Sequence, residues 1–145
     1  MFKMRHFIDK LRDEEIVAAI RAAEVLTSGE IRVFVTHHRV NEPLAAAQKE
    51  FVRLGMTKTS EHNGVLIYVA PLSRKFAIIG DSAVHAQCGD AFWSEVATEM
   101  TAHFKREQFT EGVVQAVHKA GELLARHFPR GTDDRNELPD GVVRD

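Results

Sequence analysis

The chain has 145 residues, of which 44% are hydrophobic and 28% charged, a balance typical of one globular domain. Its 19 Lys and Arg against 21 Asp and Glu give a net charge of −2, which argues against a general nucleic-acid binder. Its longest apolar run, residues 65–72, is too short to span a bilayer, and no secretory signal is visible. A single cysteine excludes an internal disulfide framework, so we expect a soluble, cytoplasmic protein.

The first half of the chain predicts a helix followed by a β-α-β unit. Apolar residues recur at helical spacing over residues 13–27, and Ser28-Gly29 ends that helix. Residues 30–38 alternate and are rich in β-branched side chains, which predicts a strand. A second helix is predicted over residues 43–55. Its expected buried stripe consists of Leu44, Ala47, Phe51 and Leu54.

The second half predicts a hairpin and then three helices. Residues 64–71 form a continuous apolar run, which is typical of a central strand covered on both faces. A short connection leads to a second strand over residues 75–81, so the two strands should be antiparallel. Helices are predicted at 82–89, 90–105 and 110–128.

The order α-β-α-β-β-α-α-α predicts an α/β fold, an α/β/α sandwich with a small mixed sheet. The β-α-β unit should make the first two strands parallel, with the second in the sheet interior. Four residues of that strand should be almost fully buried: Val65, Leu66, Ile67 and Val69. We expect one domain over residues 1–129 and a mobile tail over residues 130–145 that contributes little to the core.

Four segments carry a resemblance to a known family. They are residues 22–33 (AAEVLTSGEIRV), 63–70 (NGVLIYVA), 76–81 (FAIIGD) and 109–113 (FTEGV). Together they resemble the TPM domain, in that family's order and spacing, over roughly residues 10–129. The resemblance implies an α/β/α sandwich with a mixed sheet, in a short member without signal peptide or membrane anchor. It also implies divalent-cation binding, acid phosphatase activity or an accessory role in larger complexes.

The predicted topology gathers carboxylates at one end of the sheet. Glu30 begins the first strand, Asp81 ends the third, and Glu24 lies in the last turn of the first helix. Asp90, at the start of a later helix, can join them. Converging carboxylates repel one another unless a cation intervenes, and oxygen ligands suit Ca²⁺ or Mg²⁺. We name these four residues the acidic rim and predict a metal site there; the resemblance also implies acidic residues at Glu30, Asp81 and Asp90.

In the alternative interpretation, these carboxylates have local roles only. Asp81 and Asp90 cap the helices that follow them, and Glu30 pairs with Arg32 or Lys75 on the surface. Glu24 is then a partly exposed residue of the first helix. The spacing is not that of an EF-hand loop.

Histidine and cysteine side chains provide further candidates. His37 and His38 are adjacent at a strand end, so alternation predicts opposite faces and argues against chelation of one metal by the pair. A mixed site of a rim carboxylate with His62 or His85 is a further hypothesis. Cys88 is a candidate nucleophile with His85 as its base, and the alternative is a small buried side chain.

Two functions follow from these observations. A binding module would dock a protein partner, with Phe92 and Trp93 either in the core or as the anchor. A metal-assisted phosphatase would use the rim cation to polarise a phosphoryl oxygen and activate water. Arg32 and Lys58 are then the candidates to stabilise transition-state charge. We favour the binding module, because the sequence shows no standard catalytic motif.

Overall fold

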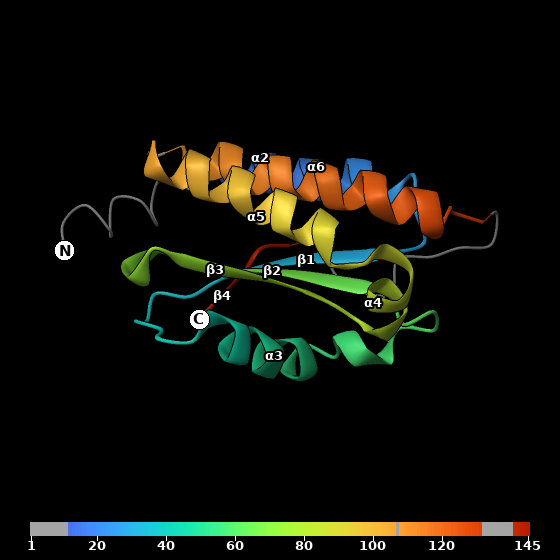
Figure 1. Ribbon diagram of the computed structural model, residues 1–145, viewed down its shortest axis with the longest axis horizontal. Coiled ribbons are helices and arrows are strands. Elements are labelled where there is room, and N and C mark those ends of the chain that lie inside the picture. The colour runs from blue at the N-terminus through green and yellow to red at the C-terminus, as the bar shows by residue number, and fades with distance from the viewer. Residues whose placement is uncertain (1–11, 107, 132–140) are drawn as a thin grey trace.

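The computed structural model describes residues 12–106, 108–131 and 141–145, and of residues 90–92 it describes the backbone alone. In this part of the chain a four-stranded sheet lies between helices on both faces (Figure 1). The α/β/α sandwich that the sequence predicts is therefore confirmed. No helix among the described residues is long and apolar enough to cross a membrane.

The sheet is mixed and has the strand order β3-β2-β1-β4. Its strands are β1 (Glu30–Val35), β2 (Gly64–Ala70), β3 (Lys75–Gly80) and β4 (Val143–Arg144). The parallel pair β1 and β2 aligns Glu30 with Gly64, and the antiparallel pair β2 and β3 aligns Val65 with Gly80. Both pairings agree with the predicted crossover and hairpin, and they place β2 in the sheet interior.

The described residues form the five predicted helices, which are distributed unevenly over the sheet. They are α2 (Asp13–Glu24), α3 (Pro43–Arg53), α4 (Ser82–Cys88), α5 (Asp90–Lys105) and α6 (Phe109–His127). Figure 1 shows α2, α5 and α6 together on one face, α3 on the other, and α4 near one end of the sheet.

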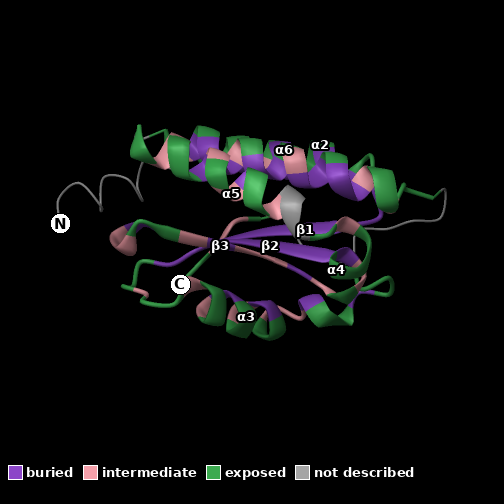
Figure 2. Cartoon of the chain, viewed as in Figure 1, coloured by how far each residue is buried: buried purple, intermediate pink, exposed green. Residues whose placement is uncertain are grey.

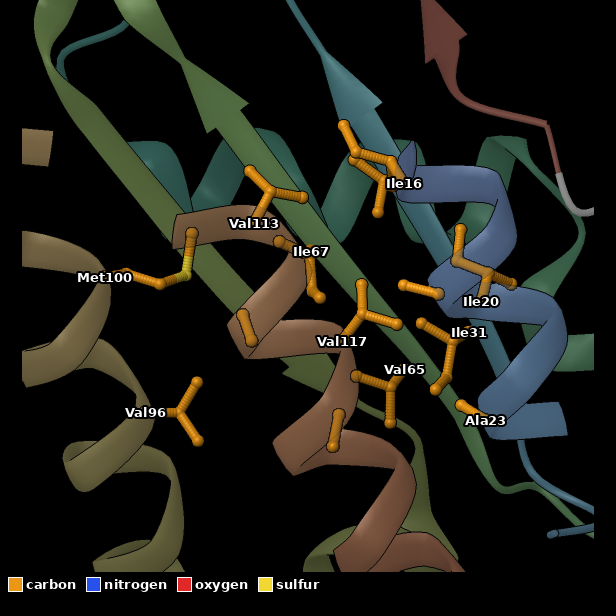
Figure 3. Packing of buried hydrophobic residues seen from close by; sticks show 14 of the residues in the cluster. Ile16, Ile20, Ala23, Ile31, Val65, Ile67, Val96, Met100, Val113 and Val117 are labelled. Atoms are coloured by element: carbon orange, nitrogen blue, oxygen red, sulfur yellow. The ribbon is translucent and has the colours of Figure 1, made fainter. Parts of the chain in front are cut away.

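The larger core lies between the sheet and the three-helix layer. Ile16 and Ile20 of α2 and Val113 of α6 belong to one buried cluster with the sheet residues Ile31 and Val65 (Figure 3). The helices themselves pack closely, because a Cβ atom placed on Gly121 of α6 would lie 2.6 Å from the Cβ of Ala23. This packing makes α2 part of the helical layer that covers the larger core.

The smaller core lies under α3. Ala47 and Phe51 of that helix pack on the sheet, where the rings of Phe34 and Tyr68 stack with centroids 5.5 Å apart. Leu44, however, is 55% exposed, so its predicted place in the buried stripe is wrong. It lies in the first turn of α3, whereas the buried residues of that helix, Ala47 and Phe51, come later.

The central strand is buried as predicted. The side chains of Val65, Leu66, Ile67 and Val69 have no exposed surface. The burial colouring in Figure 2 shows β1 and β2 as a buried layer between partly exposed helices. A continuous apolar run is the sequence pattern of a strand with a helix on each face, and the two cores supply those faces.

Residues 141–145 differ from the expected mobile tail. Val143 and Arg144 form β4, which pairs parallel to Phe34 and Val35 of β1. Val142 packs against the larger core and Val143 against the smaller one. The expectation that the whole segment contributes little to the core is therefore wrong for its last residues. Without β4, the outer side of β1 would be an unpaired sheet edge. The rest of the expected tail, residues 132–140, lies outside the described residues, and the boundary at residue 129 stays a prediction.

Candidate functional site

The amino ends of β1 and β2 bring three members of the acidic rim to one end of the sheet. Glu24, the last residue of α2, accepts a hydrogen bond through Oε2 from the backbone N–H of Ile31 at 3.3 Å. Glu30 is aligned with Gly64 in β2, and the backbone N–H of Asp81 donates to the carbonyl of Gly64 at 2.9 Å. This placement follows from the parallel crossover and the hairpin together.

Two of these carboxylates are buried much more deeply than the local-role alternative assumes. Glu24 and Glu30 are each 1% exposed. Glu24 falls on the same helix face as Ile20, which packs in the larger core, and Glu30 begins an interior strand of the sheet. A surface pairing of Glu30 and a partly exposed Glu24 are therefore both wrong.

Asp81, in contrast, has the capping role that the alternative gave it. It is the N-cap of α4, and its Oδ1 accepts a hydrogen bond from the backbone N–H of Ser82 at 2.7 Å. Its other oxygen, Oδ2, is buried, has no hydrogen-bond partner and lies 3.7 Å from Nδ1 of His62. One oxygen of Asp81 thus caps the helix, and the second lies beside the ring of His62 without a hydrogen bond.

The three described carboxylates share one end of the sheet, but they do not converge on one point. Strand alternation puts Glu30 on the same face as Phe34, toward α3, whereas Glu24 approaches from α2 on the other face. Among side chains that the structure describes, a compact group of three potential metal ligands forms elsewhere, at His37, His38 and Asp145. Asp90 begins α5, and its side chain lies outside the description. The four-residue metal site therefore stays a prediction.

Neutral polar side chains, which the sequence-based site left out, also line this end of the sheet. The Nδ2 amide of Asn63 donates to Oγ of Ser28 at 3.0 Å, and both residues are buried. The backbone N–H of Gly29 donates to Oγ1 of Thr27 at 3.0 Å. These residues lie in the segments that resemble the TPM domain, so the family pattern was the available signal for them.

His37 and His38 lie at the opposite, carboxyl end of β1. Their ring centroids are 4.2 Å apart, so the expectation that they point to opposite faces is wrong. Alternation applies within a strand, whereas β1 ends at Val35 and both histidines belong to the connection that follows. Asp145, which follows β4, meets them there, with Oδ1 2.8 Å from Nδ1 of His37.

The other sequence candidates are accounted for by packing. Burial raises the pKa of the Cys88 thiol, which is the opposite of the shift that a nucleophilic cysteine needs. Cys88 packs against the larger core, and so does Trp93. The structure therefore supports a packing role for both residues. The side chain of Phe92 lies outside the described residues.

Two surface hollows lie away from the acidic rim. One, of about 490 Å³, lies between α2 and α6 and is lined by residues such as Arg12, Thr110 and His118. The other, of about 440 Å³, lies beside the edge strand β3, and Leu44 and Trp93 are among its lining residues. Neither is lined by Glu24, Glu30 or Asp81.

Comparison with known proteins assigns the family. The TPM domain matches residues 2–123, and the chain belongs to that family. Among solved structures, it is similar to the BA42 protein of the psychrophilic bacterium Bizionia argentinensis. The two are 39% identical with a TM-score of 0.86, over 94% of this chain and 96% of that chain.

A more distant likeness concerns the fold alone. The N-terminal domain of a protein from P. gingivalis is 19% identical with a TM-score of 0.61, over 77% of this chain and 72% of that chain. A search of curated proteins found no match.

Proposed function

We propose that this TPM domain is a binding module whose acidic rim takes a divalent cation, Ca²⁺ or Mg²⁺. The observation that carries the proposal is the buried Oδ2 of Asp81, which has no hydrogen-bond partner at the sheet end shared with Glu24 and Glu30. A buried carboxylate oxygen is costly unless positive charge or a donor compensates it. Hard cations supply that charge and prefer oxygen ligands.

The affinity should be modest. The three described carboxylates are not gathered into one compact group, so binding requires side-chain rearrangement, whose cost reduces affinity. We therefore expect a dissociation constant on the order of a millimolar, within the range of weak calcium sites.

A calcium titration tests this proposal. Millimolar Ca²⁺ should raise the melting temperature of the parent by mass action, and Asp81→Asn should reduce the rise. Monovalent salt at equal ionic strength should have much less effect, because screening is weaker than coordination. Glu61→Gln, in an exposed residue outside the acidic rim, is the matched control and should behave as the parent. A flat titration of the parent would remove the cation site.

The partner-binding role is supported by the hollow beside β3. An edge strand offers backbone donors and acceptors to an added segment, and the hollow next to it has apolar side chains such as Phe76 and Ile78. Leu44 lies in its lining and is 55% exposed. We therefore propose that a protein partner docks against β3 and the start of α3.

Two matched surface variants test the docking role. Leu44→Lys places a charge in the hollow, whereas Leu26→Lys alters a residue that is similarly exposed but outside the lining. A partner protein isolated by its affinity for the parent should bind the Leu26→Lys variant with unchanged affinity. It should bind the Leu44→Lys variant at least about tenfold more weakly, as expected for an interface anchor. Equal binding by both variants would place the docking surface elsewhere.

The phosphatase alternative has less support from the geometry. Arg32, one candidate for transition-state stabilisation, is only 7% exposed within β1, and Lys58, the other, is exposed. A substrate phosphate needs preorganised donors that it can reach. We expect no Ca²⁺- or Mg²⁺-dependent hydrolysis of p-nitrophenyl phosphate above that of the Asp81→Asn variant. Hydrolysis that requires the cation and is lost in Asp81→Asn would favour the enzyme.

A further inference from the structure

The carboxyl ends of β1 and β4 carry a cluster that the acidic rim does not include. His37 and His38 follow β1, and Asp145 follows β4, the parallel strand beside it. One ligand atom from each side chain lies within 4.8 Å of the other two. The carboxylate is 2.8 Å from His37 through Oδ1 and 3.9 Å from His38 through Oδ2.

These spacings are close to those of a bound zinc ion. Ligands at 2.0–2.1 Å in a tetrahedron are about 3.3 Å from one another, so small side-chain adjustments bring the three atoms to coordinating positions. All three side chains are at the surface, where ring rotation is available, and the exposed fraction of the His38 side chain is 67%. Water has access to a fourth position.

The carboxylate of Asp145 is held in place by groups that are not themselves ligands. Oγ1 of Thr36 donates to Oδ2 at 2.5 Å, and the backbone N–H of His37 donates to Oδ1 at 2.9 Å. Thr36 is 1% exposed, and its backbone N–H donates to the carbonyl of Val69 at 3.0 Å. Hydrogen bonds that fix a ligating carboxylate are the supporting shell that protein metal sites use.

We propose that His37, His38 and Asp145 form a transition-metal site that takes Zn²⁺ with three protein ligands and one open position. Two imidazoles and one carboxylate suit Zn²⁺, whereas Ca²⁺ and Mg²⁺ require oxygen ligands. The site is separate from the acidic rim, because Thr36, which directly follows β1, lies six residues beyond Glu30, the first residue of that strand, a distance of about 20 Å. It lies at the sheet edge where α/β proteins commonly bind ligands, beyond the carboxyl ends of parallel strands.

Zinc titration of the full chain by calorimetry tests the site. The parent should bind one Zn²⁺ with a dissociation constant in the micromolar range or below, and excess Mg²⁺ should not compete. His38→Gln and Asp145→Asn should each weaken binding at least about tenfold. His118→Gln, in an exposed histidine of α6, should bind as the parent does.

Co²⁺ provides a second readout that is independent of folding stability. Four-coordinate Co²⁺ at the site should give strong visible absorption in the parent, and Zn²⁺ should abolish it by displacement. The ring nitrogen Nε2 of His38 lies 3.9 Å from Oδ2 of Asp145, which is longer than a hydrogen bond. His38→Gln should therefore leave the melting temperature unchanged. No saturable zinc binding by the parent up to about 100 µM would overturn the site. Undiminished binding by the His37→Gln, His38→Gln double variant would also do so.

Discussion

At the scale of single residues, Asp81 combines two roles through its two oxygens. Oδ1 caps α4 through the backbone N–H of Ser82, while Oδ2 is directed toward His62 at 3.7 Å. A carboxylate that caps a helix loses little when it becomes an amide, because Asn also accepts the capping bond. The cap and the proposed cation site can therefore be separated by the choice of substitution.

We expect Asp81→Ala to lower the free energy of unfolding by about 1 kcal/mol in the absence of Ca²⁺, the usual cost of a lost N-cap, and by more in millimolar Ca²⁺, which stabilises the parent. Asp81→Asn should lower it by only a few tenths of a kcal/mol in the absence of Ca²⁺. Urea denaturation of the two variants beside the parent measures both values. Equal losses in the two variants would show that the charge of Asp81, rather than its cap, stabilises the fold.

Asp145 is the other residue whose environment has a measurable consequence. Burial by itself would raise the pKa of its carboxyl group, but hydrogen bonds from Thr36 and His37 outweigh burial, so that the pKa lies below its ordinary value of 3.8. A carboxyl group with a lowered pKa in the folded state stabilises the fold above its ordinary pKa. That stabilisation is lost as the pH falls through the lower, folded-state pKa.

The free energy of unfolding of the parent should therefore fall more between about pH 5 and pH 2 than that of Asp145→Asn, which has no carboxyl group to protonate. Urea denaturation at each pH without metal measures the difference between the two proteins. Parallel pH profiles would mean that ionisation of Asp145 does not stabilise the folded state.

At the scale of elements, β4 shows how a very short strand can be positioned by its neighbours. Two residues cannot form a stable strand alone, but β1 provides a fixed partner. The guanidinium Nη2 of Arg144 lies 2.7 Å from Oδ1 of Asp13, which ties the strand to the start of α2. The chain after α6 is thereby connected to the first helix of the fold.

Removal of residues 142–145 should lower stability by about 1–2 kcal/mol, because it exposes the partly buried contacts of Val142 and Val143 and ends the pairing with β1. For a domain of this size that loss corresponds to a fall in melting temperature of roughly 3–8 °C. Differential scanning calorimetry of the shortened chain measures it. An unchanged melting temperature would support the original expectation that residues 142–145 contribute little to the core.

At the scale of the whole molecule, the sheet separates two proposed cation sites of different chemistry. The acidic rim lies at the amino ends of β1 and β2, and the histidine site at the carboxyl ends of β1 and β4. The strand between them is buried and packed on both faces. A rigid strand has no second arrangement through which one site could alter the other.

The two sites should therefore bind independently. Saturation with Ca²⁺ should change the dissociation constant of Zn²⁺ by less than about twofold, since allosteric coupling typically changes affinity by about fivefold or more. Calorimetric titration of Zn²⁺ with and without millimolar Ca²⁺ measures the coupling, with Mg²⁺ as a second comparison. A larger change would indicate that the cations compete for one site, or that the sheet transmits a structural change between two.

Much of this fold was predictable because its signals are local. The alternation of residues 30–38 and the apolar run of residues 64–71 define strands, and their separation by one helix requires a parallel crossover. Burial of Glu24 also follows from helical spacing, since it lies four residues after Ile20.

The candidate sites were predictable only in part. Sequence order and strand direction bring Glu24, Glu30 and Asp81 to one end of the sheet. Alternation within a strand, however, says nothing about side chains beyond its end, so it failed for His37 and His38.

The sequence by itself therefore determined the two interior strands, the hairpin, the helices and the end of the sheet at which the carboxylates lie. Only the tertiary structure decided that residues 143–144 pair with β1 and that Asp145 reaches the histidines more than a hundred positions earlier. The physical reason is separation along the chain. A segment with few apolar residues has weak local preference, and its conformation is set by the edge of β1 with which it pairs.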